Sequence, residues 1–146
     1  MNRTLSDIVG HQPRALVTVG PLATVHVAVE LLCQHRIGAV VVVDPGGAMV
    51  GILSERDVMR LVAERRELET LHVGDVMTRD VVVGLDTDAL GHAMSVMTQQ
   101  RIRHLPIMRA GRPAAMVSIG DIVHALRSEE RVAIRDLNAY IMGTYR

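Results

Sequence analysis

The sequence predicts an α/β fold, of the α+β kind, made of two β-α-β-β-α repeats packed sheet to sheet about a pseudo-two-fold axis. The first observation is an apolar run that ends at Ser54 and continues as a helix, with Asp57 three residues on. The second is the return of this pattern at Ser118 and Asp121, 64 residues later. The third is that the same order of elements precedes each junction, which indicates an internal duplication. A small sheet with helices on one face leaves its other face open, so two copies should cover each other.

Composition limits the classes of function. The chain has 146 residues, 49% hydrophobic and 22% charged, which suits a globular protein with a real core. Its formal net charge is zero, so we expect no nucleic-acid partner. No apolar run is long enough to span a membrane and the N-terminus lacks a signal-peptide core, so we expect no membrane partner and a cytoplasmic location. The single cysteine, Cys33, follows the apolar positions Val25 and Val29, and we expect it to be buried and inert.

The first repeat shows clear start and stop signals. Thr4 and Thr24 are expected to cap helices, and the β-branched run at 39–43 predicts a fully buried strand. The Asp-Pro-Gly-Gly segment at 44–47 predicts a hairpin turn. In chain order the predicted elements are a helical turn at 4–9, a strand at 16–19, helix 24–36, strand 39–43, strand 49–53 and helix 55–66.

The second repeat follows a charged linker at 64–69 and restates this order. The predicted elements are a helical turn at 73–77, strand 81–83, helix 89–100, strand 105–108, a turn at 110–112, strand 114–117 and helix 119–126. We therefore divide the chain into a first repeat at 1–68, a second at 69–128 and a C-terminal helical tail at 129–146.

Each junction places a hydroxyl at the start of a helix and a carboxylate three residues on. One interpretation is a capping box, in which the two side chains satisfy helix amides and need no ligand. The other is a ligand site, because helix N-termini attract polar and anionic groups. The recurrence of aspartate at matched positions favours the ligand site. Because the chain has no Phe or Trp, a nucleobase held by its main body would lie between aliphatic side chains.

The repeated order of elements, the Ser-x-x-Asp junctions and the segment Arg-His-Leu-Pro-Ile at 103–107 resemble a tandem pair of CBS domains, the Bateman module. The resemblance covers about residues 5–127, and the tail at 137–143 is similar to that of small stand-alone bacterial members. One departure is Ala115, where the family usually has glycine.

The resemblance implies a regulatory module that binds AMP, ADP or ATP, with NAD(H) as the next candidate, and performs no chemistry on them. A carboxylate suits the ribose because its two oxygens can accept from a cis-diol. At the main site the resemblance implies Asp121 and Ser118 at the ribose and phosphate, Arg103 and His104 near the phosphates, and Val17, Ile37 and Met116 around the adenine. At a second site it implies Asp57, Ser54, Ile52, Val82 and Ile102.

The second site is expected to be the weaker one. Its positions equivalent to Arg103 and His104 are Gly38 and Ala39, which carry no charge. Glu55 is expected to repel phosphate there, with Arg56 beside it as a charge that can offset the repulsion. This site should be empty or take the uncharged part of a larger ligand such as NAD.

Other functions remain as alternatives. An enzyme would need a base and a nucleophile beside the phosphates, and His104 is the one nearby candidate; the histidines show no metal-binding spacing, so we expect neither an enzyme nor a metal site. The main alternative is a dimeric protein-interaction adaptor that binds no ligand. The resemblance also implies a homodimer that signals to an unknown regulated protein, with the tail at 131–140 as a candidate contact surface.

Overall fold

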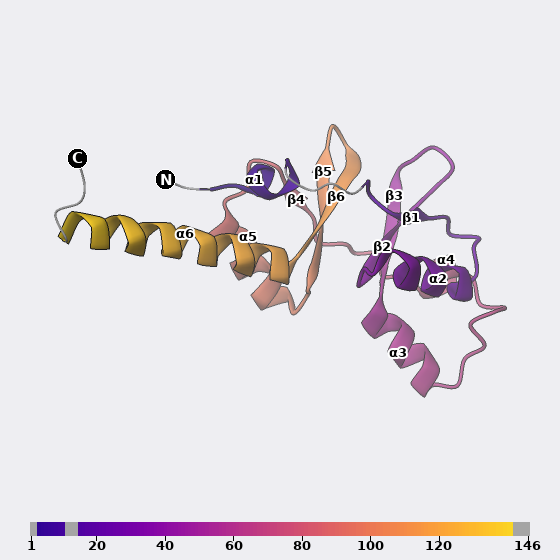
Figure 1. The fold of residues 1–146 in the computed structure, drawn as a ribbon. Coiled ribbons are helices and arrows are strands. Elements are labelled where there is room, and N and C mark those ends of the chain that lie inside the picture. The colour runs from indigo at the N-terminus through magenta and orange to yellow at the C-terminus, as the bar shows by residue number, and fades with distance from the viewer. Residues whose placement is uncertain (1–2, 11–14, 142–146) are drawn as a thin grey trace.

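The computed structural model describes residues 3–10 and 15–141 and contains two three-stranded sheets flanked by helices (Figure 1). The first repeat contains α1 (Leu5–Val9), β1 (Thr18–Val19), α2 (Val25–His35), β2 (Ala39–Val43), β3 (Met49–Ser54) and α3 (Glu55–Ala63). The second contains α4 (Val73–Val76), β4 (Gly84–Leu85), α5 (Leu90–Gln100), β5 (His104–Arg109), β6 (Arg112–Ser118) and α6 (Ile119–Ile141). The last five residues of the predicted tail, 142–146, lie outside the described residues.

The two sheets have the same topology. Their strand orders are β1-β2-β3 and β4-β5-β6, and in each the first pair is parallel and the second antiparallel. Figure 1 shows the sheets next to each other in the middle of the molecule, with α2 and α3 beside one and α5 and α6 beside the other. The predicted α+β class with two equivalent repeats is confirmed.

Details of the backbone repeat as well. The helices α2 and α5 both end at an arginine in the left-handed region, Arg36 and Arg101, each with φ of 54°. The amide of Glu55 donates to the carbonyl of Gly38 at 2.9 Å, and at the equivalent place in the second repeat Ile119 donates to Arg103 at 2.8 Å. The duplication inferred from sequence therefore extends to individual hydrogen bonds.

The short helical turns cross between the repeats. Leu5 of α1 is fully buried in the core of the second repeat, in a cluster with Leu90 and Ile107. Val73 of α4 is fully buried in the core of the first repeat, and Met77 joins it there. Each repeat thus completes its core with a helical turn that precedes the other repeat in the chain.

Several predicted elements differ from the structure, and two are shortened: the strand predicted at 16–19 forms at Thr18–Val19 only, and the helix predicted at 55–66 ends at Ala63. The β-branched run at 81–83 predicted a strand, but β4 lies at Gly84–Leu85, where Gly84 pairs with Ile107 of β5. A Cβ added to Gly84 would lie 2.9 Å from the Leu105 side chain, so pairing at this position depends on glycine. The helix predicted at 119–126 continues without a break to Ile141, and its second half extends away from both sheets (Figure 1).

The prediction that Cys33 is buried is wrong, because its side chain is exposed. The inward face of α2 is formed by Val25, Ala28 and Leu32. Successive residues of an α-helix are about 100° apart, so Cys33 lies well around the helix from Leu32 and faces solvent.

Candidate functional site

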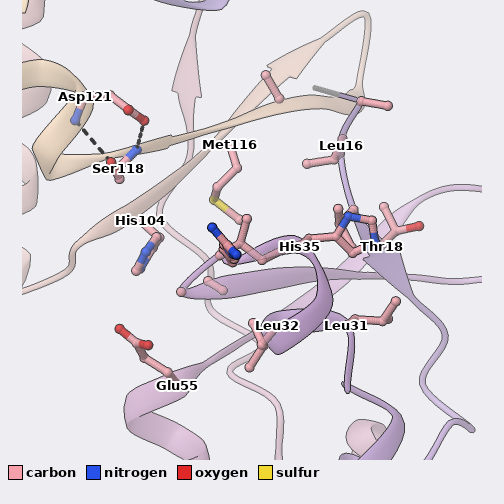
Figure 2. A pocket seen from close by; sticks show the side chains of 17 residues that line it. Leu16, Thr18, Leu31, Leu32, His35, Glu55, His104, Met116, Ser118 and Asp121 are labelled. Carbon is pink, nitrogen blue, oxygen red and sulfur yellow. Dashed lines mark hydrogen bonds between the residues drawn. The ribbon is translucent and has the colours of Figure 1, made fainter. Parts of the chain in front are cut away.

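A cavity of about 1270 Å³ lies between the two repeats (Figure 2). The segment before and at β1, the end of α2 and the start of β2 and α3 form its first-repeat wall. The start of β5, the end of β6 and the start of α6 form the other wall. The lining residues are Ala15, Leu16, Val17, Thr18, Leu31, Leu32, His35, Arg36, Ile37, Gly38, Ala39, Glu55, His104, Ala115, Met116, Ser118 and Asp121.

The structure brings together nearly all the residues predicted for the main site. The six that line the cavity are Asp121, Ser118, His104, Val17, Ile37 and Met116. Arg103 does not line it: its side chain is exposed, although its carbonyl accepts the hydrogen bond from the Ile119 amide. The apolar residues and the polar junction thus share one cavity because they come from different repeats.

Ser118 and Asp121 form a reciprocal cap at the start of α6. The Asp121 carboxylate accepts from the Ser118 amide through Oδ2 at 2.8 Å, and the Ser118 hydroxyl accepts from the Asp121 amide at 3.1 Å (Figure 2). Among the residues that the structure describes, Asp121 Oδ1 accepts no hydrogen bond and joins no ion pair. The cap therefore fixes the carboxylate while leaving one oxygen available at the edge of the cavity.

Ser54 and Asp57 form the matching cap at the start of α3, but the carboxylate is more occupied. Asp57 Oδ2 accepts from both the amide and the hydroxyl of Ser54, at 2.9 and 3.0 Å. Asp57 Oδ1 lies 3.8 Å from a guanidinium nitrogen of Arg60, and the side chain is only 16% exposed. In α6 the position of Arg60 is taken by His124. Both junctions cap their helices in the same way. Only Asp121 keeps a carboxylate oxygen that is not in a hydrogen bond or ion pair with another described residue and can accept from a ligand.

The other residues predicted for the second site do not line this cavity. Ile52 makes a bridge with Thr78, and Val82 and Ile102 pack against the core of the second repeat. Gly38, Ala39 and Glu55, which were assigned to the second site, line the Asp121 cavity instead.

Gly38 of the first repeat lies close to His104 of the second. A Cβ added to it would lie 2.5 Å from His104 Nε2 and 3.3 Å from Glu55 Oε1. Glycine at this position therefore leaves room for an imidazole from one repeat beside a carboxylate from the other. Figure 2 shows both side chains at the same end of the cavity.

Burial of the imidazole lowers the pKa of His104 below its ordinary value, and this is the largest influence. Glu55 and Asp121 act in the opposite direction, whereas Arg103 and Arg56 add to the lowering. The imidazole is therefore mostly neutral near pH 7 and acts there as a hydrogen-bonding group rather than a fixed cation.

Sequence reasoning missed several lining residues. Leu31 and Leu32 lie near the end of α2, and Arg36 follows that helix in the left-handed conformation. These residues could have been predicted from Ile37, which follows the end of the same helix. If Ile37 lines a cavity, the last turn of the helix before it lies at that cavity too. No local pattern indicated that Glu55 would face the other repeat.

The comparisons with known proteins fit this geometry. The CBS domain pattern matches residues 5–64 and 73–128. The chain belongs to the CBS-domain family. It carries two CBS domains in tandem, and CBS domains are in general regulatory rather than catalytic modules.

Relatives with this architecture are found in plants and bacteria. The mitochondrial CBS domain-containing protein CBSX3 of Arabidopsis thaliana is 43% identical over 128 residues, which cover 84% of this chain and 62% of CBSX3. The CBS domain-containing protein YhcV of Bacillus subtilis is 32% identical over 127 residues, which cover 86% of this chain and 89% of YhcV. The chain thus spans about three fifths of one relative and most of the other.

Solved structures show the same fold. A CBS-domain protein from Agrobacterium tumefaciens superimposes with a TM-score of 0.80 at 37% identity, covering 86% of this chain and 94% of that one. A CBS-domain protein from Pyrobaculum aerophilum, solved in complex with AMP, gives 0.74 at 25% identity and covers 86% and 98%. Within the described residues, no helix of our chain is both long and apolar enough to cross a membrane.

Proposed function

We propose that this CBS-domain pair is a regulatory module that binds an adenosine nucleotide between its repeats and leaves it chemically unchanged. AMP, ADP and ATP are the first candidates and NAD(H) is the second. The proposal is carried by the cavity that combines the Asp121 carboxylate with the aliphatic side chains of Val17, Ile37 and Met116. A carboxylate oxygen can accept from a ribose hydroxyl, and aliphatic walls can hold a purine without aromatic stacking.

Two further observations support an adenosine ligand. The cavity, at about 1270 Å³, is roomy enough for a nucleotide with its phosphates. The structurally similar Pyrobaculum aerophilum protein, at 25% identity, was solved with AMP.

A ligand at this place contacts both repeats, so binding can change how they sit against each other. Such a change requires that the ligand bind one arrangement more tightly than the other. We propose that a homodimer transmits it to a regulated protein in the cytoplasm. Ser118 lies opposite His104 in the β5–β6 pair, but its hydroxyl accepts from the Asp121 amide in the helix cap and has no hydrogen bond to the imidazole among the described residues, so we propose no turnover of the nucleotide.

The test is calorimetric titration of the full chain with AMP, ADP, ATP, NAD and NADH. Asp121→Asn is the test variant, and Asp57→Asn is its matched control because both residues cap a helix in the same way. We expect at least one ligand to bind the wild type, Asp121→Asn to weaken binding about tenfold or more, and Asp57→Asn to change it less than about threefold. Equal effects of the two variants would remove Asp121 from the site.

A ligand-free adaptor is the second candidate. Both Ser-Asp pairs are complete caps without a ligand, and α6 exposes Val132, Ile134, Leu137 and Ile141. If no adenosine ligand binds the wild type at millimolar concentration, the adaptor becomes the better account.

A further inference from the structure

We propose that Glu55 determines which adenosine ligand the cavity accepts, by favouring a single phosphate over the longer chains of ADP and ATP. This inference rests on the proposed adenosine site and adds a specificity-determining residue to it.

The geometry places Glu55 opposite the second repeat. Its backbone begins α3, and its amide is held by the Gly38 carbonyl at 2.9 Å. Its side chain nevertheless lines the cavity of Asp121, and its carboxylate lies close to the same glycine as the imidazole of His104. Figure 2 shows Glu55 and His104 at the left of the cavity, on the side away from Leu16 and Thr18.

Few charged side chains line the cavity that contains Glu55 and His104. The charged side chains in the lining are Arg36, Glu55 and Asp121, and their formal charges sum to −1. Two further arginines, Arg56 and Arg103, act on His104 without lining the cavity. Of the two charged groups on the first-repeat wall, Arg36 and Glu55, the Glu55 carboxylate is the one that acts on His104.

A nucleotide oriented by Asp121 brings its phosphates towards His104. One phosphate there can accept hydrogen bonds from the imidazole and from the start of α6. A second and third phosphate that extend past His104 add negative charge close to the Glu55 carboxylate. Arg56 and Arg103 can offset this charge only from outside the lining. Like charges at short range, partly shielded from water, oppose binding, so the penalty grows with the length of the phosphate chain.

The experiment compares affinities for AMP, ADP and ATP by calorimetry on the full chain, without Mg²⁺ and at fixed ionic strength. The variants are Glu55→Gln, which removes the charge, and Glu55→Asp, which keeps it. Glu64→Gln is the matched control, because Glu64 caps the other end of the same helix and lies outside the cavity. Thermal unfolding of each variant confirms that it is folded.

We expect the wild type to bind AMP about tenfold more tightly than ATP. Glu55→Gln should reduce that ratio at least about fivefold by strengthening ATP binding, and Glu55→Asp and Glu64→Gln should leave it near the wild-type value. An unchanged ratio in Glu55→Gln, or an equal change in Glu64→Gln, overturns the role of Glu55 while leaving the adenosine site intact. Failure of all three nucleotides to bind the wild type overturns the site and this inference together.

Discussion

Leu5 packs against Gly84 in the core of the second repeat, with its Cδ1 atom 3.0 Å from the position that a Cβ on Gly84 would occupy. The contact joins the helical turn α1 to the short strand β4, and Leu5 has no exposed surface. The start of the chain therefore belongs structurally to the repeat that follows later.

Leu5→Ala should destabilise the whole protein. Removing a fully buried leucine side chain costs about 2–5 kcal/mol of the free energy of unfolding, because both burial and packing are lost. Urea denaturation measures this change. Leu22→Ala is the control, since Leu22 is 82% exposed and its replacement should cost little. Equal effects of the two substitutions would contradict the crossed packing.

The two serine caps provide a second test. Ser54→Ala and Ser118→Ala each remove an acceptor for a helix amide, so each should lower the free energy of unfolding by about 1 kcal/mol. Ser118→Ala alone should also weaken AMP binding, because only this serine lines the cavity. Thermal unfolding with and without AMP separates the loss of stability from the loss of AMP binding. If Ser54→Ala also loses its stabilisation by AMP, the assignment of AMP to the Asp121 cavity is contradicted.

Stability should fall as the pH is lowered, in part because of His104. Burial lowers the pKa of its imidazole in the folded state, so the unfolded chain binds a proton more readily. Above the ordinary pKa range of histidine, the imidazole is neutral in both the folded and the unfolded state. As the pH falls from that range towards the lowered pKa of the folded state, the unfolded chain takes up a proton first, and stability is lost. His104→Gln should show a smaller loss between about pH 8 and pH 5.5 in urea denaturation. His92→Gln, on the exposed side of α5, should behave like the wild type, and identical losses in all three proteins would refute the effect.

An ion pair on the surface should also make the free energy of unfolding fall as the pH is lowered, over a more acidic range than His104. Arg109 donates through Nε to Asp86 at 2.7 Å, and this hydrogen bond lowers the pKa of the Asp86 carboxyl. The stabilisation is present above the ordinary aspartate range and lost as the pH falls through the lowered value. Arg109→Gln should therefore reduce the melting temperature slightly near neutral pH, with the difference narrowing in acid. Arg131→Gln on α6 is the control, and a difference that is constant with pH would exclude the ion pair as its source.

The predicted homodimer can be tested through α6. Ile134 and Leu137 are 59% and 58% exposed on the part of the helix that extends from the body, and they are suited to contact a second copy. Light scattering after size exclusion should give a mass twice the 16.0 kDa of the chain. Ile134→Glu combined with Leu137→Glu should yield the monomer, whereas Asn138→Glu should not. A wild type that remains monomeric at high concentration would contradict the prediction.

The repeats and the main cavity were predictable because their signals are local. The strand at 39–43 follows from its β-branched sequence, and the caps follow from Ser-x-x-Asp spacing. The resemblance to a CBS pair then placed Asp121 and Val17, which come from different halves, in one site, and the structure brings both to one cavity.

The parts that the sequence did not predict depend on contacts between the halves. The Glu55 side chain lines a cavity that both repeats form, so the pattern of α3 alone could not reveal that it lies there with Asp121. The position of β4 is set by its pairing with β5, which overrode the β propensity of 81–83. The crossing of Leu5 and Val73 is likewise invisible locally, because each turn is amphipathic whichever core it joins.

The crossed turns have a consequence for how the protein can move. Because α1 lies on the second repeat and α4 on the first, the backbone passes between the repeats twice, once from α1 to β1 and once from α4 to β4. Two bodies joined at one point can rotate about it in any direction, whereas two separate tethers leave rotation about the line that joins them as the main free motion. A ligand between the repeats would thus turn them about one defined axis, and a partner would have to read that rotation.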